Sequence, residues 1–118
     1  MSIDNALASV AVKNLKTSAR WYEGIFGRPA DSTPLPQVAE WWFRRGGGVQ
    51  VYELPERAGS GSFTLTVSHL EEEIEKLRRL GLDTGNRTSA RSVKTVMIKD
   101  PDGNSIAFAE VTDPATSR

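Results

Sequence analysis

The feature that most constrains this chain is an internal repeat. Residues 6–27 (ALASVAVKNLKTSARWYEGIFG) align with residues 61–81 (GSFTLTVSHLEEEIEKLRRLG) at an offset of 55, and one position is missing near the end of the second copy. The matched positions are Val12 with Val67, Leu15 with Leu70, Ala19 with Ile74, and Tyr22 with Leu77. A repeat at a little under half the chain length predicts two copies of one structural unit.

Each copy has the pattern of a strand, a helix and three further strands. Apolar residues recur at helical spacing in both copies: Leu15, Ala19, Tyr22 and Phe26, then Leu70, Ile74, Leu77 and Leu80. Hairpins are predicted at 39–44 with 49–54 and at 93–99 with 105–111. A weaker strand is expected before each hairpin, at 29–36, where three prolines indicate a sheet edge, and at 84–89. Ser68 and Glu71 predict a capping box for the second helix, with the acidic residues 71–73 near its positive end.

Composition excludes several classes of protein. The 118 residues carry 15 basic and 15 acidic side chains, which argues against a nucleic-acid partner. The absence of cysteine excludes disulfides, thiolate metal sites and a cysteine nucleophile, and there is one histidine. We find no apolar run long enough for a membrane span and no signal-peptide pattern at the start. We therefore expect a cytoplasmic protein with no membrane partner.

Three segments carry a resemblance to a known family. Residues 12–27 (VKNLKTSARWYEGIFG), 67–81 (VSHLEEEIEKLRRLG) and 100–110 (DPDGNSIAFAE) resemble the two helix signatures and the closing hairpin of the vicinal oxygen chelate superfamily. This superfamily includes glyoxalases, bleomycin-resistance proteins and extradiol dioxygenases. The resemblance implies an α+β fold in which tandem βαβββ modules form a cupped mixed sheet with the helices on the outside. It also implies a homodimer.

The expected domain is single and built from two repeats. The first module spans 5–54, a linker spans 55–61, the second module spans 62–111, and 112–118 form a frayed tail.

The residues at the metal-ligand positions of the superfamily are of the wrong chemical type in this chain. The resemblance assigns the four ligand positions to Leu7, Gln50, Ser62 and Ala107. A leucine, an amide, a hydroxyl and a methyl group cannot hold a catalytic divalent metal against water. We therefore predict no metal, no other cofactor and no catalytic residue of the usual kind.

Three titratable side chains near these positions are given structural roles. His69 is predicted to be a surface residue at the start of the second helix. Glu53 and Glu110 lie three residues beyond the ligand positions, so strand alternation turns them to the opposite face. They are predicted to be solvent-exposed or edge carboxylates, with a role at a dimer seam left open.

Period-two alternation identifies candidate ligand-binding residues. In the first strand of the second copy, every second residue is small and carries a hydroxyl group, and the residues between them are large and apolar. The side with the hydroxyl groups is therefore expected to face the cavity inside the cupped sheet. Of the two neighbouring tryptophans, which point to opposite faces, one is expected to reach the cavity. The candidate cavity-lining residues are Leu7, Ser9, Trp41, Trp42, Phe43, Gln50, Tyr52, Ser62, Thr64 and Ala107.

These residues favour binding over catalysis, because they include no acid, base or strong nucleophile. The leading prediction is a metal-independent protein that binds a small aromatic or amphipathic molecule. One alternative is an atypical enzyme of the same superfamily, using Tyr52 with Glu40 or Arg44. Another is a non-catalytic dimeric partner module.

Overall fold

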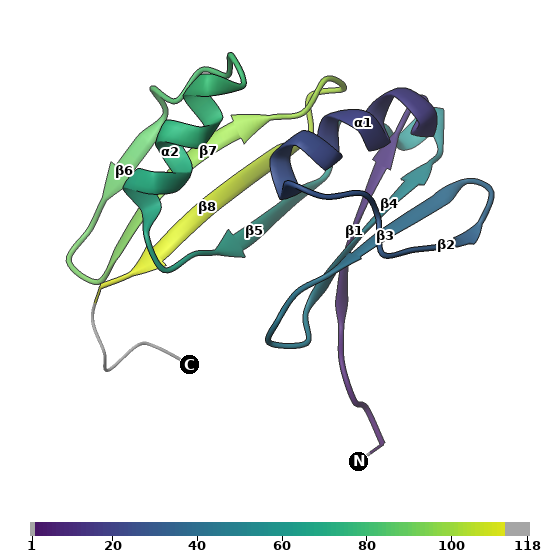
Figure 1. Ribbon diagram of the computed structural model, residues 1–118, viewed down its shortest axis with the longest axis horizontal. Helices are drawn as coiled ribbons and strands as arrows, with labels where there is room; N and C mark the ends of the chain where they lie inside the picture. The colour runs from purple at the N-terminus through teal and green to yellow at the C-terminus, as the bar shows by residue number, and fades with distance from the viewer. Residues whose placement is uncertain (1, 113–118) are drawn as a thin grey trace. The chain divides into compact units, whose positions relative to one another are not determined.

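The structure is a computed structural model that describes residues 2–112. The chain divides into two compact units, one made of Met1–Gly61 with Asp100–Asn104 and one made of Ser62–Lys99 with Ser105–Arg118. Each unit holds one four-stranded mixed sheet and one α-helix (Figure 1). The predicted α+β class with two βαβββ modules is confirmed. Most of the tail expected at 112–118 lies outside the described residues.

The first unit begins with β1 (Leu7–Val12) and α1 (Leu15–Phe26) and continues through β2 (Ser32–Leu35), β3 (Val38–Trp42) and β4 (Gly48–Glu53). Its strand order is β1-β4-β3-β2, with β1 parallel to β4 and the other pairs antiparallel. The proline-rich strand β2 therefore lies at the sheet edge, as predicted. Pro34 has no amide hydrogen to donate, and at an edge this does not interrupt the hydrogen bonds between interior strands. A short 3-10 helix, η1 (Pro55–Arg57), follows β4.

The second unit repeats this topology. It contains β5 (Ser62–Thr66), α2 (Leu70–Arg79), β6 (Arg87–Ser89), β7 (Val93–Lys99) and β8 (Ser105–Val111). Its strand order is β5-β8-β7-β6, again with the first pair parallel. The weak strands β2 and β6 are shorter than the segments predicted for them, and both lie at a sheet edge.

The core of the first unit lies between α1 and one face of its sheet. Tyr22 and Ile25 of α1 are buried there, together with Trp41 of β3. Rings from the helix and the strand form a cluster, with Tyr22 and Phe26 centroids 5.8 Å apart and Phe26 and Trp41 centroids 5.1 Å apart. The other buried residues of this core come from the strands: Val10, Val12, Ala39, Val49 and Val51. We conclude that an aromatic cluster anchors α1 to its sheet.

The core of the second unit is aliphatic by comparison. α2 lies along β7 and β8 in Figure 1 and buries Leu70, Ile74 and Leu77. The sheet contributes the buried residues Phe63, Val96, Ile98, Ile106 and Phe108. The predicted apolar stripe is confirmed for its first three residues and wrong for Leu80, which is 46% exposed because the helix ends there.

The starts of the two helices correct two predictions. His69, not Ser68, is the N-cap residue of α2, and no side-chain capping bond is made there, so the predicted capping box is wrong. Instead, the Leu70 amide donates to Oε1 of Glu110 at 2.7 Å. Glu53 does the same for α1, accepting from the Leu15 amide at 2.9 Å. These two glutamates are therefore not merely solvent or edge carboxylates, because each satisfies an otherwise unpaired donor at a helix start.

The buried side chain of Asn104 connects several segments of the first unit. Its Nδ2 donates to the Ala11 carbonyl at 2.9 Å and to Oδ2 of Asp100 at 2.8 Å. Its Oδ1 accepts from the amides of Gly59 at 3.1 Å and Gly61 at 2.8 Å. The DPDGN turn therefore does more than reverse the chain between β7 and β8, because its asparagine completes the hydrogen bonding of β1 and of the segment after η1.

Tyr22 extends this network from α1. Its hydroxyl donates to Oδ2 of Asp100 at 2.7 Å. Burial raises the pKa of Tyr22 far above its ordinary value of 10.0, and the hydrogen bond to the Asp100 carboxylate raises it further. The folded protein therefore keeps this phenol protonated to higher pH than the unfolded chain does.

Replacing the buried amide should be costly. Asn104→Ala leaves the Ala11 carbonyl and two glycine amides without their partner, so we expect a loss of about 3 kcal/mol in the free energy of unfolding, measured by urea denaturation. The exposed Asn86→Ala is the matched control and should change stability by less than about 0.5 kcal/mol. Equal effects of the two substitutions would contradict the structural role of Asn104.

Tyr22 should make stability depend on alkaline pH. Its folded-state pKa lies above the unfolded value, so its contribution is fully present below pH 10 and is lost as the pH rises further. We expect the free energy of unfolding to fall by about 1.4 kcal/mol per pH unit above pH 10 from this group alone. Tyr22→Phe should remove this part of the slope, whereas Tyr52→Phe should retain it. The measurement is a series of denaturation curves at increasing pH.

The carboxylate cap of α2 is also testable. Glu110→Ala removes the capping acceptor of the Leu70 amide, and no N-cap side chain of α2 replaces it, so we expect a loss of about 1 kcal/mol in stability. Glu53→Ala should cost less, because Glu53 is exposed and Asn14 also caps α1 through a bond from the Thr17 amide. Thermal unfolding of both variants shows which substitution lowers stability more. A larger loss for Glu53→Ala than for Glu110→Ala would refute this prediction.

Candidate functional site

Most of the binding residues predicted for the first unit lie on one face of its sheet, the face that points away from α1. We call this the open face of the first sheet. Strand pairing aligns Ser9 with Gln50 and Gln50 with Glu40, and it places Tyr52 opposite Val38. Strand alternation and this register put the following residues on the open face: Leu7, Ser9, Val38, Glu40, Trp42, Gln50 and Tyr52.

A hydrogen-bonded chain of side chains crosses the centre of this face. Ser9 Oγ donates to Gln50 Oε1 at 3.3 Å, and Gln50 Nε2 donates to Glu40 Oε2 at 2.8 Å. Both Gln50 and Glu40 are half-buried. The amide of Gln50, which the resemblance placed at a metal-ligand position, thus links a hydroxyl on β1 to a carboxylate on β3.

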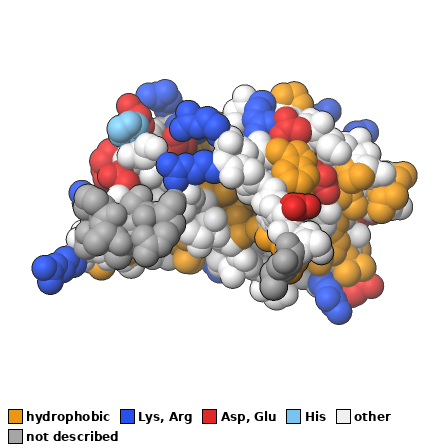
Figure 2. Space-filling model, turned by 90° about the horizontal axis from the view of Figure 1, so that it is seen from below, with side chains coloured by type: hydrophobic (Ala, Val, Ile, Leu, Met, Phe, Trp, Pro, Cys, Tyr) orange, Lys and Arg blue, Asp and Glu red, His pale blue; other side chains and the backbone are white. Residues whose placement is uncertain are grey.

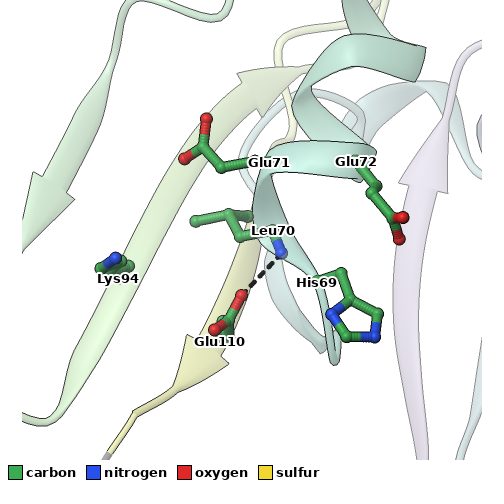
Figure 3. Close-up of a pocket in the computed structure, with 6 residues that line it drawn as sticks. All are labelled: His69, Leu70, Glu71, Glu72, Lys94 and Glu110. Atoms are coloured by element: carbon green, nitrogen blue, oxygen red, sulfur yellow. Dashed lines mark hydrogen bonds between the residues drawn. The ribbon is translucent and has the colours of Figure 1, made fainter.

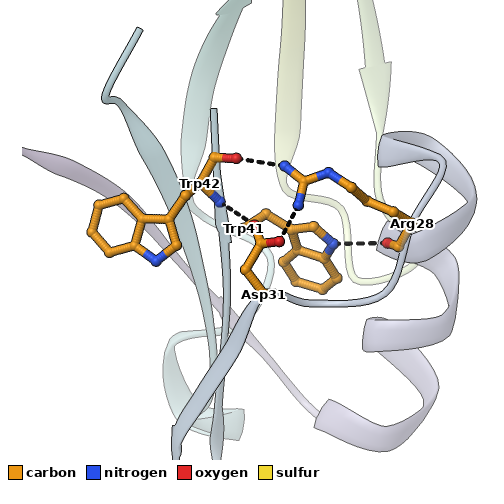
Figure 4. Close-up of polar contacts among 4 residues, drawn as sticks. All are labelled: Arg28, Asp31, Trp41 and Trp42. Atoms are coloured by element: carbon orange, nitrogen blue, oxygen red, sulfur yellow. Dashed lines mark hydrogen bonds and ion pairs between the residues drawn. The ribbon is translucent and has the colours of Figure 1, made fainter. Parts of the chain in front are cut away.

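The two tryptophans of β3 have different roles. Trp41 is fully buried beneath α1, and its Nε1 donates to the Arg28 carbonyl at 2.9 Å. Trp42 is 38% exposed and lies on the open face. Figure 4 shows the two indoles directed away from each other. The prediction that Trp41 lines a cavity is therefore wrong, because the aromatic cluster of the core takes it up, and Trp42 is the exposed member of the pair.

Phe43 also packs on the helix side of the sheet. Its ring lies 5.4 Å from that of Phe26, centroid to centroid. Its assignment to the cavity lining is wrong for the same reason as that of Trp41. The aromatic side chains left on the open face are those of Trp42 and Tyr52.

The backbone of Trp42 is held by a clamp from the segment after α1. Asp31 Oδ2 accepts from the Trp42 amide at 2.7 Å, and Arg28 donates both to the Trp42 carbonyl and to Asp31 (Figure 4). The hydrogen bond from Arg28 is the main cause of a lowered pKa for the Asp31 carboxyl, and the Trp42 amide lowers that pKa further. The clamp fixes Trp42 at the end of β3, and nothing in the sequence motifs indicated it.

Gly48 provides the space for the Trp42 ring. A Cβ atom at this glycine would lie 3.1 Å from Trp42 Cε3 and 2.9 Å from the Trp41 carbonyl oxygen. The indole therefore packs directly over the backbone at the start of β4. A residue with a side chain at position 48 would clash with the Trp41 carbonyl oxygen and press against the indole of Trp42, so glycine is required there.

The second unit has an open face of its own, on the side of its sheet away from α2. Its predicted binding residues Ser62, Thr64 and Ala107 lie there, because Ser62 pairs with Ser105 and Thr64 with Ala107. Lys99 Nζ donates to Ser105 Oγ at 3.1 Å, and the exposed Met97 pairs with Ala107. The sequence interpretation missed Lys99 and Met97, although strand alternation along β7 could have placed them.

The four positions that a superfamily metal would use do not fit a metal. Leu7 and Gln50 lie on one open face and Ser62 and Ala107 on the other, and together they offer one amide and one hydroxyl. Gln50 Oε1 already accepts from Ser9. Within residues 2–112, no group of three or more histidine, aspartate or glutamate side chains is placed to hold a metal ion. The donor chemistry of these positions is that of hydrogen bonding.

A hollow of about 290 Å³ lies at the start of α2, on the helix side of the second sheet (Figure 3). It is lined by His69, Leu70, Glu71, Glu72, Lys94 and Glu110. Glu110 is engaged as the cap of α2, and Glu71 pairs with Arg87 at 3.6 Å. His69 is exposed, as predicted, and Figure 2 shows the pale-blue histidine among charged side chains. Of the polar side chains that line this hollow, Glu110 therefore holds the helix start in place.

Comparison with known proteins identifies the family. No family model and no curated protein matches the chain. Among solved structures, a glyoxalase/bleomycin resistance protein from Catenulispora acidiphila is 31% identical, with a TM-score of 0.82, and the match covers 91% of this chain and 97% of that one. The chain belongs to the glyoxalase/bleomycin resistance proteins of the vicinal oxygen chelate superfamily.

Two further structures share the fold at lower identity. TnmS3, an antibiotic binding protein from a Streptomyces species, is 18% identical with a TM-score of 0.76, and the match covers 94% of this chain and 98% of TnmS3. The oxidase ChaP-H2 is also 18% identical with a TM-score of 0.76, and covers 99% of this chain and 98% of its own. The same fold therefore serves both binding and oxidation. In residues 2–112, no helix combines the length and the apolar character that a membrane span requires.

Proposed function

We propose that this protein is a metal-independent binding protein of the glyoxalase/bleomycin resistance type, which holds a small aromatic or amphipathic molecule on its open faces. The observation that carries the proposal is the open face of the first sheet. It combines an exposed indole, a half-buried phenol and a hydrogen-bonded Ser9–Gln50–Glu40 chain. Such a surface offers stacking area together with a few fixed polar groups.

The residues at the positions where the superfamily binds a metal support ligand binding without a metal. Leu7 and Ala107 have no donor atom, and the Gln50 amide is engaged with Ser9 and Glu40. The fold shared with TnmS3, which is described as an antibiotic binding protein, supports this proposal. The proposal includes the cytoplasmic location and the homodimeric state expected from the sequence, and sedimentation analysis of the purified chain tests the latter.

The test is calorimetric titration of the EDTA-treated protein with naphthalenemethanol, a neutral aromatic alcohol. We expect saturable binding that Trp42→Ala weakens by about fivefold, since the exposed indole supplies the stacking surface. Leu80→Ala is the matched control, because it removes an exposed apolar side chain from the end of α2 and should leave the affinity unchanged.

The same protein is then titrated with Ni²⁺, Zn²⁺, Mn²⁺ and Fe²⁺ and followed by thermal unfolding. We expect no stoichiometric binding and no rise in melting temperature. A stoichiometric metal that stabilises the protein would refute metal independence, and absence of saturable binding of this alcohol and of its ammonium and carboxylate analogues would refute the binding function.

A further inference from the structure

We propose that the open face of the first sheet recognises a positively charged ligand, an aromatic or amphipathic molecule that carries an ammonium group, and that Glu40 is the residue that selects for this charge. This inference rests on the proposed binding function and deepens it by naming the ligand class.

The charge on this face comes from one residue. Among the strand residues assigned above to the open face of the first sheet, Glu40 is the only one with a formal charge, and the others are apolar or neutral polar groups. It lies on β3, an interior strand between β4 and β2, and it is half-buried. A partly desolvated carboxylate interacts more strongly with an opposite charge than an exposed one does.

The Glu40 carboxylate is oriented but not neutralised. Gln50 donates to Oε2, and Ser9 in turn fixes the amide of Gln50. No hydrogen bond or ion pair within residues 2–112 engages Oε1 of Glu40. The neutral amide of Gln50 offers no counter-charge to Glu40, so the carboxylate keeps an acceptor atom for a charged N–H donor.

The neighbouring aromatics favour the same ligand. Trp42 follows Glu40 by two residues on the same strand and therefore on the same face. Its ring is positioned over Gly48, which pairs with Trp42, and its backbone is held by Arg28 and Asp31. An indole next to a carboxylate attracts a cation through both its π-face and the adjacent negative charge. A carboxylate ligand would instead meet repulsion from Glu40.

The test compares three probes that share one ring system and differ only in charge: naphthylmethylammonium, naphthalenemethanol and naphthoate. Calorimetric titration at low salt should show that the ammonium probe binds about tenfold more tightly than the alcohol, and that the carboxylate probe binds most weakly. Glu40→Gln, which retains an oxygen that can accept from Gln50, should abolish the preference for the ammonium probe over the alcohol.

Two controls keep the result interpretable. Glu56→Gln makes the same chemical change in η1 and should retain the full preference. In the unmodified protein, raising the salt concentration from 20 mM to about 500 mM should reduce the preference severalfold, because screening weakens partly exposed charge pairs. This second measurement does not depend on the folding of any variant.

The outcomes separate the two proposals. Equal binding of the ammonium and alcohol probes, or a preference that survives Glu40→Gln, overturns charge selection while the binding function stands. Tightest binding of naphthoate also overturns it, and would point to the arginines of the turn between β3 and β4. If none of the three probes binds, both proposals fail.

Discussion

The buried amide of Asn104 is the contact on which the first unit depends most. It pairs with the β1 backbone, with two glycine amides after η1 and with Asp100, which in turn accepts from Tyr22 of α1. Strand, loop, turn and helix are thus joined through one side chain whose every polar atom is satisfied, and no buried side-chain polar atom among residues 2–112 lacks a partner. A polar group in an apolar core is tolerated only under this condition. The chain leaves the second sheet at Lys99, contributes five residues to the first unit and returns at Ser105.

The fold could be predicted from the sequence because each element is encoded by a local or repeated pattern. The strand–helix repeat, the two hairpins and the proline-bearing edge strand follow from spacing and turn residues, and all are present. Helix starts were harder to predict, because Glu53 and Glu110 reach their helices from strands 38 and 40 residues away in sequence. A capping motif read from neighbouring residues cannot reveal a cap that tertiary structure supplies.

The candidate site could be predicted only in part, because contacts between residues distant in sequence also decide which side chains are exposed there. Alternation identified the open faces, yet it could not decide which of two adjacent tryptophans is exposed. That choice is made by the ring cluster of Tyr22 and Phe26, which takes up Trp41, and by the clamp from Arg28 and Asp31 on Trp42. The Ser9–Gln50–Glu40 chain likewise depends on strand register, which brings residues from three strands together. Pairings of this kind become visible only once the sheet is built.

The carboxylate caps have a consequence for how each unit assembles. α1 carries its own cap at Asn14, so its first turn can form before the rest of the unit is in place. α2 has no such side chain at His69 and obtains its acceptor from β8. The start of α2 is therefore completed only when β8 has joined the sheet, which couples helix formation to sheet closure in that unit. Two copies of the same architecture thus differ in what stabilises the start of their helix, which is partly local in the first copy and supplied by a distant strand in the second.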